Sequence, residues 1–203
     1  MAIDLENRTI QGLNAFVAFV LLNLLYLLSC LPLVTAGAAT SALLGVTMRY
    51  ADQERGRLLR DYLRGFVTDF PRATAVHLIL GAPILALLFS ARFWSVLDGP
   101  LSLAAAGIAV LAALYLIGAW IHAMALVAAF RAPLARVLRT ALLLPGAEPL
   151  RTSGLVLVPA VLLALALVVP GAAWVLLTIG ASMGGYVAAL LLRGAHRRYE
   201  PAA

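Results

Sequence analysis

A small set of polar side chains lies within long apolar stretches, and these residues carry the chemistry that the chain could use. They are Asn23, Tyr26, Thr35, Thr40 and His122. Amide, hydroxyl and imidazole groups at membrane depth can line a path for water or a small solute, and an ionisable group there is a functional candidate. The alternative role is an interhelical hydrogen bond, because a buried amide in lipid must find a partner. For Asn23 we favour the hydrogen bond.

No familiar catalytic or metal-binding pattern accompanies these residues. The sequence has no P-loop, no GxSxG, no HExxH and no paired cysteines, and its three histidines lie in separate segments. The apolar stretches also contain no Asp, Glu or Lys, the residues that ion-coupled carriers usually place at mid-depth. We therefore expect no enzymatic activity, no cofactor and no metal.

The composition indicates a membrane protein. Of the 203 residues, 64% are hydrophobic and only 12% are charged, with a mean hydropathy of +1.00. A soluble domain is about 25% charged and roughly half apolar. The single cysteine, Cys30, excludes a disulfide within the chain. We expect one transmembrane domain over residues 1–203.

Six apolar stretches predict an all-α, polytopic helical membrane protein, because about 20 apolar residues cross a bilayer core. The predicted spans are residues 13–31, 33–48, 73–91, 101–130, 154–169 and 171–192. The turns at Pro32 and Pro170 are tight, so merging or half-inserting one pair of spans would leave five or four crossings. A cleaved signal peptide is disfavoured, because the first stretch is too long and no positive cluster precedes it.

The arginines predict the orientation of these spans. With the N-terminus in the cytoplasm and six crossings, Arg92 alone of the fifteen basic residues lies outside, and the C-terminus is cytoplasmic. The net charge of +6 then suits the anionic lipids of the inner leaflet rather than nucleic acid.

Two segments on the predicted inner side have amphipathic periodicity, at residues about 54–70 and 133–144. Their polar faces carry arginines that could dock a partner or bind lipid, namely Arg57, Arg60, Arg64, Arg136 and Arg139. Asp61 is spaced to pair with Arg57 and Arg64 on one helix.

Small residues at four-residue steps predict close helix packing in two places. They are Gly37, Ser41 and Gly45 in one stretch and Gly180 and Gly184 in another. Such residues let two helix backbones approach closely in lipid. The neighbouring helix could belong to this chain, which we favour, or to another protein.

One region resembles a known family. The run Asn23-Leu24-Leu25-Tyr26, followed by Leu31-Pro32-Leu33-Val34-Thr35-Ala36-Gly37, resembles the YesL family of bacterial membrane proteins. The agreement covers about residues 14–75, with Tyr26 where tryptophan is common and Ala38 where proline is common. The resemblance implies a bacterial inner-membrane protein of uncertain function, associated with carbohydrate uptake systems of the ATP-binding-cassette (ABC) type.

Three hypotheses follow from these features. The first is a non-enzymatic accessory or membrane subunit of a carbohydrate ABC-type importer, with the importer subunits or a second copy of the chain as partners. The second is a stand-alone channel or facilitator lined by the polar residues named first. The third is a membrane scaffold or sensor whose basic inner surface binds lipid.

Overall fold

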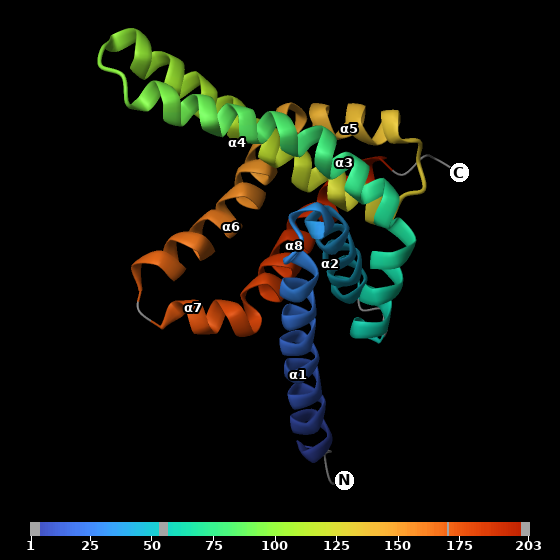
Figure 1. Cartoon of the computed structure of the whole chain (residues 1–203). Helices are drawn as coiled ribbons and strands as arrows, with labels where there is room; N and C mark the ends of the chain where they lie inside the picture. Colours follow the sequence, from blue (N-terminus) through green and yellow to red (C-terminus); the bar gives the residue numbers. More distant parts are fainter. Residues whose placement is uncertain (1–4, 53–56, 170, 200–203) are drawn as a thin grey trace.

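A computed structural model describes the backbone of residues 5–52, 57–169 and 171–199, and the side chains within 12–52, 57–169 and 171–192. Several predictions therefore lie outside the described residues: the start of the helix predicted at 54–70, the side chains of Arg8, Arg55, Arg193, Arg197 and Arg198, and the positions of both termini. Every element in the described part is helical (Figure 1). The elements are α1 (Leu5–Cys30), η1 (Leu33–Thr35), α2 (Ala36–Ala51), α3 (Leu58–Ser95), α4 (Pro100–Ala129), α5 (Leu134–Ala147), α6 (Pro149–Val168), α7 (Ala172–Val175), η2 (Leu176–Gly180) and α8 (Ala181–Tyr199).

Within these residues, five helical stretches are long and apolar enough to cross a membrane. They are Gly12–Cys30, Leu58–Ser95, Pro100–Ala129, Pro149–Val168 and Ala172–Leu192. Only 11% to 33% of the residues in their most apolar windows are buried. Exposed apolar helices of this length are compatible with a multi-pass membrane protein, in which hydrocarbon would surround them.

The stretch predicted as a span at 33–48 is helical, but its bounds differ from the predicted ones. It begins with the 3₁₀ turn η1 and continues as α2, which has 16 residues. At 1.5 Å per residue this helix is about 24 Å long, less than the roughly 30 Å of a bilayer core. A helix of this length can be accommodated because most of its side chains are buried among α1, α3, α4 and α8.

Helix α3 also differs from the sequence prediction. We predicted an amphipathic helix at 54–70 and a separate span at 73–91, but α3 is one helix of 38 residues. It passes through Pro71 and Pro83 without ending. In Figure 1 its first turns run in a different direction from the rest, and proline is the usual cause of such a bend. The helix therefore continues through Thr68, Asp69 and Arg72, the polar residues between the two predicted elements.

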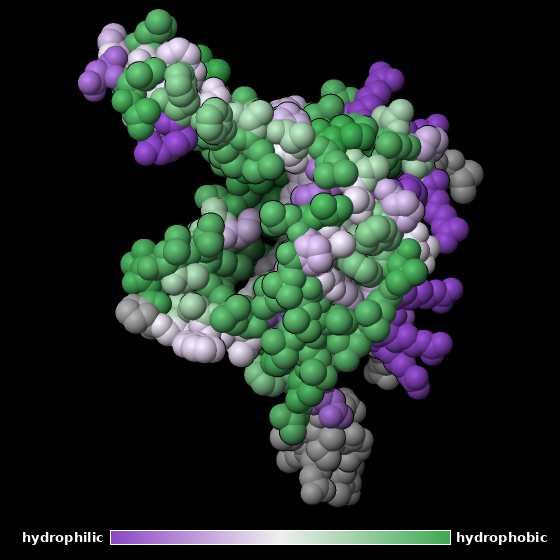
Figure 2. Space-filling model, in the orientation of Figure 1, coloured by the Kyte–Doolittle hydropathy of each residue, from purple (hydrophilic) through white to green (hydrophobic). Residues whose placement is uncertain are grey.

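The two ends of α3 have different surfaces. Arginines line its first turns, whereas its last turns carry Phe93 and Trp94, packed edge to face beside Arg92. Figure 2 shows hydrophilic side chains gathered along one side of the molecule, near the start of α3 and α5, and a smaller group at the α3–α4 turn. Apolar surface covers most of what lies between. Arg92, the one arginine that the predicted topology places outside, is thus at the C-terminal end of α3.

The C-terminal region is less regular than predicted. The predicted spans 154–169 and 171–192 correspond to α6 and to the succession of α7, η2 and α8. Gly171 begins the second part with φ of 91°, a left-handed conformation that glycine adopts readily. The segment η2 is a π-helical turn, in which the backbone hydrogen bonds shift by one residue.

Candidate functional site

The side chain of Asn23 holds the π-helical turn in place. Asn23 is completely buried, and its Nδ2 donates to the carbonyl oxygens of Leu177 at 2.6 Å and Leu176 at 3.4 Å. Its Oδ1 accepts from the backbone N–H groups of Ala181 at 2.7 Å and Ser182 at 3.1 Å. These are backbone groups at the junction of η2 and α8, where the ladder of hydrogen bonds changes register. Asn23 therefore supplies partners that lipid cannot supply.

The next three predicted residues lie around the turn between α1 and α2. The hydroxyls of Tyr26 and Thr40 are 3.3 Å apart and join the two helices. Thr35 Oγ1 donates to the carbonyl oxygens of Ser29, at 2.6 Å, and Pro32, at 2.7 Å. Thr35 thus closes the chain reversal at Pro32, and its hydroxyl is engaged with backbone.

His122 lies in a third place, between α4 and α6. It is completely buried, and its Nε2 is 3.0 Å from the hydroxyl of Thr152. Gly118, one turn earlier, makes this approach possible, because a Cβ there would lie 2.4 Å from Thr152 Cγ2. The five residues predicted to line a path therefore fall at three separate contacts between helices.

The small residues of α2 pack against other helices of this chain. A Cβ added to Gly37 would lie 2.3 Å from His77 Cβ on α3, and one added to Gly45 would lie 3.2 Å from Ala128 Cβ on α4. Ser41 Oγ donates to the carbonyl oxygen of Met124 on α4 at 3.1 Å. The α2 face is therefore engaged within the chain.

The two predicted glycines of the last stretch have different surroundings. At Gly184 an added Cβ would lie 3.1 Å from Leu162 Cδ1 on α6. At Gly180 the nearest atoms belong to Leu176, four residues earlier in the same chain segment. Gly180 thus relieves crowding inside the π-helical turn, in a buried segment that packs against α1.

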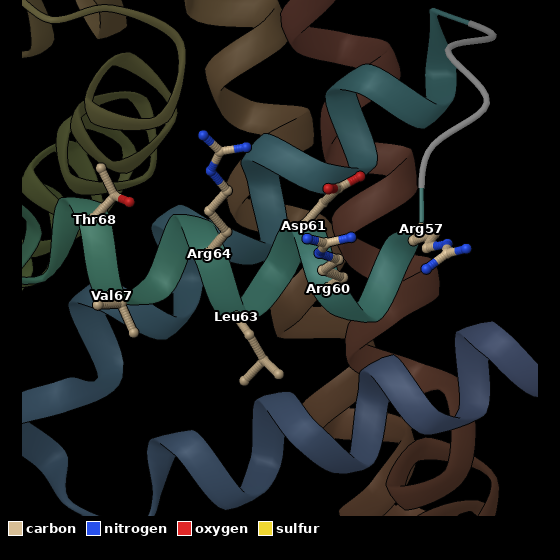
Figure 3. Close-up of a pocket in the computed structure, with 7 residues that line it drawn as sticks. All are labelled: Arg57, Arg60, Asp61, Leu63, Arg64, Val67 and Thr68. Carbon is tan, nitrogen blue, oxygen red and sulfur yellow. The ribbon is translucent and has the colours of Figure 1, made fainter.

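The arginines at the start of α3 border a surface hollow of about 740 Å³. It is lined by Arg57, Arg60, Asp61, Leu63, Arg64, Val67 and Thr68 (Figure 3). We expected Asp61 to pair with Arg57 and Arg64. The ion pairs recorded among the described residues join Arg72 to Asp69 and Arg151 to Glu148, so the expected pairs do not form.

A second hollow, of about 680 Å³, lies where α2, α3 and α4 meet. Arg49 near the end of α2, Arg64 on α3 and Arg131 just after α4 all line it, together with three aspartates, Asp52, Asp61 and Asp69. Arginines that are far apart in the sequence therefore converge on one side of the molecule.

Helix α5 is fixed to this charged side by Arg72. The Nη2 of Arg72 donates to the carbonyl oxygens of Phe130 at 3.2 Å and Ala132 at 2.7 Å, in the link between α4 and α5. Tyr115 Oη donates to the carbonyl oxygen of Leu142 at 2.6 Å. The first contact joins the link that precedes α5 to α3, and the second joins α5 itself to α4.

Helix α5 covers most of the segment 133–144 and has a buried face and an exposed face. Val137, Ala141 and Leu144 are buried, whereas Arg136 and Arg139 are exposed. The arginine pair thus points away from a helix that is held by contacts just before its start and near its end.

Three contacts were missing from the sequence interpretation. Arg72 was considered only for its charge and not as a donor to backbone carbonyls. The contact of Thr152 with His122 was not predicted. The hydrogen bond from Trp120 Nε1 to His77 Nδ1, at 3.1 Å, was not predicted either. The available signal was the presence of polar residues near the ends of apolar stretches. In the part of the chain that the structure describes, no three His, Cys, Asp or Glu side chains come together as a metal site would require.

One segment of the chain, residues 19–91, matches a protein-family model. A search of curated proteins and a search of solved structures found no similar protein. The matched segment runs from the middle of α1 through α2 to near the end of α3, and so includes Asn23, the α2 packing face and the arginines of α3. Residues 19–91 match the family described as "Protein of unknown function, DUF624".

Proposed function

We propose that this protein is a non-enzymatic accessory or membrane subunit of a carbohydrate import system of the ABC type. The link to carbohydrate uptake comes from the resemblance of about residues 14–75 to the YesL family, whose proteins fall within the family matched by residues 19–91. The proposed partners are the subunits of the importer. The polar residues inside the helices serve the fold in this proposal, and recognition takes place at the charged side.

The observation that carries the proposal is the exposed arginine pair on α5. Arg136 and Arg139 face outward from a helix whose other face is buried in the protein. Because Arg72 binds a carbonyl of the link just before α5 and Tyr115 binds a carbonyl within α5, a partner would meet a surface that is already ordered. A preorganised surface loses little conformational entropy on binding. Its positive charge favours an acidic surface on the partner.

Co-purification tests this proposal. The tagged full-length protein is solubilised gently from its own membranes, and the bound proteins are identified by mass spectrometry. We expect permease and ATPase subunits of a carbohydrate importer with the wild type and with Arg92→Gln, which changes an arginine at the other end of α3. Arg136→Gln/Arg139→Gln should release them, and increasing salt should do the same. Wild-type protein that carries no importer subunits in several mild detergents would end the proposal.

The proposal includes the topology. We propose a bacterial inner-membrane location, cytoplasmic termini, six crossings with α2 as a short one, and α5 and the first turns of α3 at the cytoplasmic surface. In a Cys30→Ser background, cysteines placed at Arg57 or Arg136 should be labelled only after the cells are opened. A cysteine at Arg92 should be labelled in intact cells. The reverse pattern would overturn the orientation.

A stand-alone channel or facilitator is the alternative function. It needs polar side chains that are free to meet a solute, whereas Asn23 and Thr35 both bind backbone groups. Flux of sugars or ions into liposomes that contain only this protein would favour the channel over the accessory role.

A further inference from the structure

The first turns of α3 combine positive charge with exposed apolar side chains. Arg57, Arg60 and Arg64 are all exposed, and so are Leu63 and Val67, which are 48% and 71% exposed. All five border the hollow of about 740 Å³. In Figure 3 Leu63 and Val67 point to one side of α3, Arg64 points to the opposite side, and Arg60 lies between them. The hollow therefore has a cationic part and an apolar part next to each other.

Arginines outnumber carboxylates among the residues that line this hollow; Arg64 also lines the second hollow, with Asp52 and Asp69. Three arginines face one carboxylate, that of Asp61, and the recorded ion pairs involve other arginines. Guanidinium groups bind phosphate oxygens through two parallel hydrogen bonds, which makes arginine suited to phosphate recognition. A phosphate group would supply the anion that the hollow lacks.

The apolar part distinguishes a lipid from a free anion. The same helix continues as an apolar stretch to Ser95, so its first turns lie at one end of a candidate span. Phospholipid headgroups are found at that depth, with acyl chains directly beneath them. Leu63 and Val67 would contact an acyl chain while the arginines contact the phosphate. A soluble phosphate has no use for these two side chains.

We propose that the start of α3 is a binding site for an anionic phospholipid, with Arg57, Arg60 and Arg64 holding the headgroup phosphate and Leu63 and Val67 contacting an acyl chain. This site is independent of the proposed docking of a partner on α5. Its test uses purified protein and lipid alone, so the two proposals can fail separately.

Lipid binding is measured on the full-length protein in a neutral detergent by native mass spectrometry. We expect phosphatidylglycerol to bind more tightly than phosphatidylcholine. Arg60→Gln/Arg64→Gln should weaken phosphatidylglycerol binding roughly thirtyfold, which at about 1.4 kcal/mol per tenfold is about 1 kcal/mol for each arginine. The matched control, Arg136→Gln/Arg139→Gln, removes the same charge and should leave the affinity unchanged.

A second measurement needs no variant. A photoactivatable phosphatidylglycerol should label the wild-type peptide that contains Leu63 and Val67. Equal weakening by both double variants would mean a general charge effect and would overturn the site. Labelling confined to other helices would also overturn it, and so would displacement of the lipid by excess inorganic phosphate, which would indicate a free-anion site.

Discussion

Replacing Asn23 by leucine should destabilise the protein at a place remote from the mutated helix. Leucine has a similar size but no polar atoms, so the carbonyl of Leu177 and the N–H groups of Ala181 and Ser182 lose their side-chain partner. The site is completely buried, and lipid offers no replacement for the lost bonds. The perturbation is therefore the loss of a brace between α1 and the π-helical turn.

The magnitude follows from the geometry of these bonds. Two of them are short, at 2.6 and 2.7 Å, and the other two, at 3.1 and 3.4 Å, are weaker. Interhelical hydrogen bonds in membranes contribute about 0.6 kcal/mol on average and about 1.7 kcal/mol at most. Counting the two short bonds, we expect the free energy of unfolding to fall by about 1 to 3 kcal/mol. If η2 relaxes toward regular α-helix in the variant, the fall in the free energy of unfolding should lie at the lower end of this range.

The assay is reversible unfolding in mixed micelles, with Asn14→Leu as the matched control. Asn14 lies on the same helix but is exposed, so its replacement should change the free energy of unfolding by less than about 0.5 kcal/mol. Amide hydrogen exchange adds a local reading, since the N–H groups of Ala181 and Ser182 should exchange faster in Asn23→Leu. Equal stability of wild type and Asn23→Leu, with unchanged exchange at these amides, would refute the role of Asn23.

The remaining predictions concern helix packing and the link to α5. Gly37→Ala should lower the free energy of unfolding by about 1–3 kcal/mol, because its Cβ would lie 2.3 Å from that of His77. Gly107 has open space around it, so Gly107→Ala should raise the free energy of unfolding by about 0.5–1 kcal/mol in the same assay. Arg72→Met should free the link between α4 and α5 from its two carbonyl contacts, so limited proteolysis should cut there faster than in wild type, while Arg92→Met should leave the cleavage rate unchanged.

The helical class and most helix positions could be predicted from the sequence, because apolar runs of bilayer length have few alternative structures. The bounds of α4 illustrate this, since the predicted span 101–130 and the observed Pro100–Ala129 nearly coincide. The continuity of α3 could not be predicted from a local pattern. Pro71 and the polar residues around it suggest a helix end, yet packing against α2 and α4 keeps the helix intact on both sides.

The partner of each polar residue was equally beyond a local pattern. The sequence indicates that Asn23 must be satisfied, but its partners are backbone atoms more than 150 positions away. The residue types do not show which backbone groups will need a side-chain partner. Here those groups lie at a π-helical turn, which depends on how α7 and α8 pack. The same reasoning applies to Arg72, whose acceptors are carbonyl oxygens of a linker.

The distribution of satisfied and unsatisfied polar groups bears on where function can reside. Within the apolar stretches, the side chains of Asn23, Thr35 and Ser41 form hydrogen bonds with backbone groups of the same chain. A residue used in this way is unsuited to bind a changing series of solutes, because each binding event would break a bond that supports the fold. Arg57, Arg60 and Arg64 on α3, or just before it, and Arg136 and Arg139 on α5 make no comparable contacts with backbone groups among the described residues, so binding there leaves the helices undisturbed. A ligand that bound the exposed arginines would therefore leave these bonds intact, whereas a solute that bound Asn23 or Thr35 would have to break them.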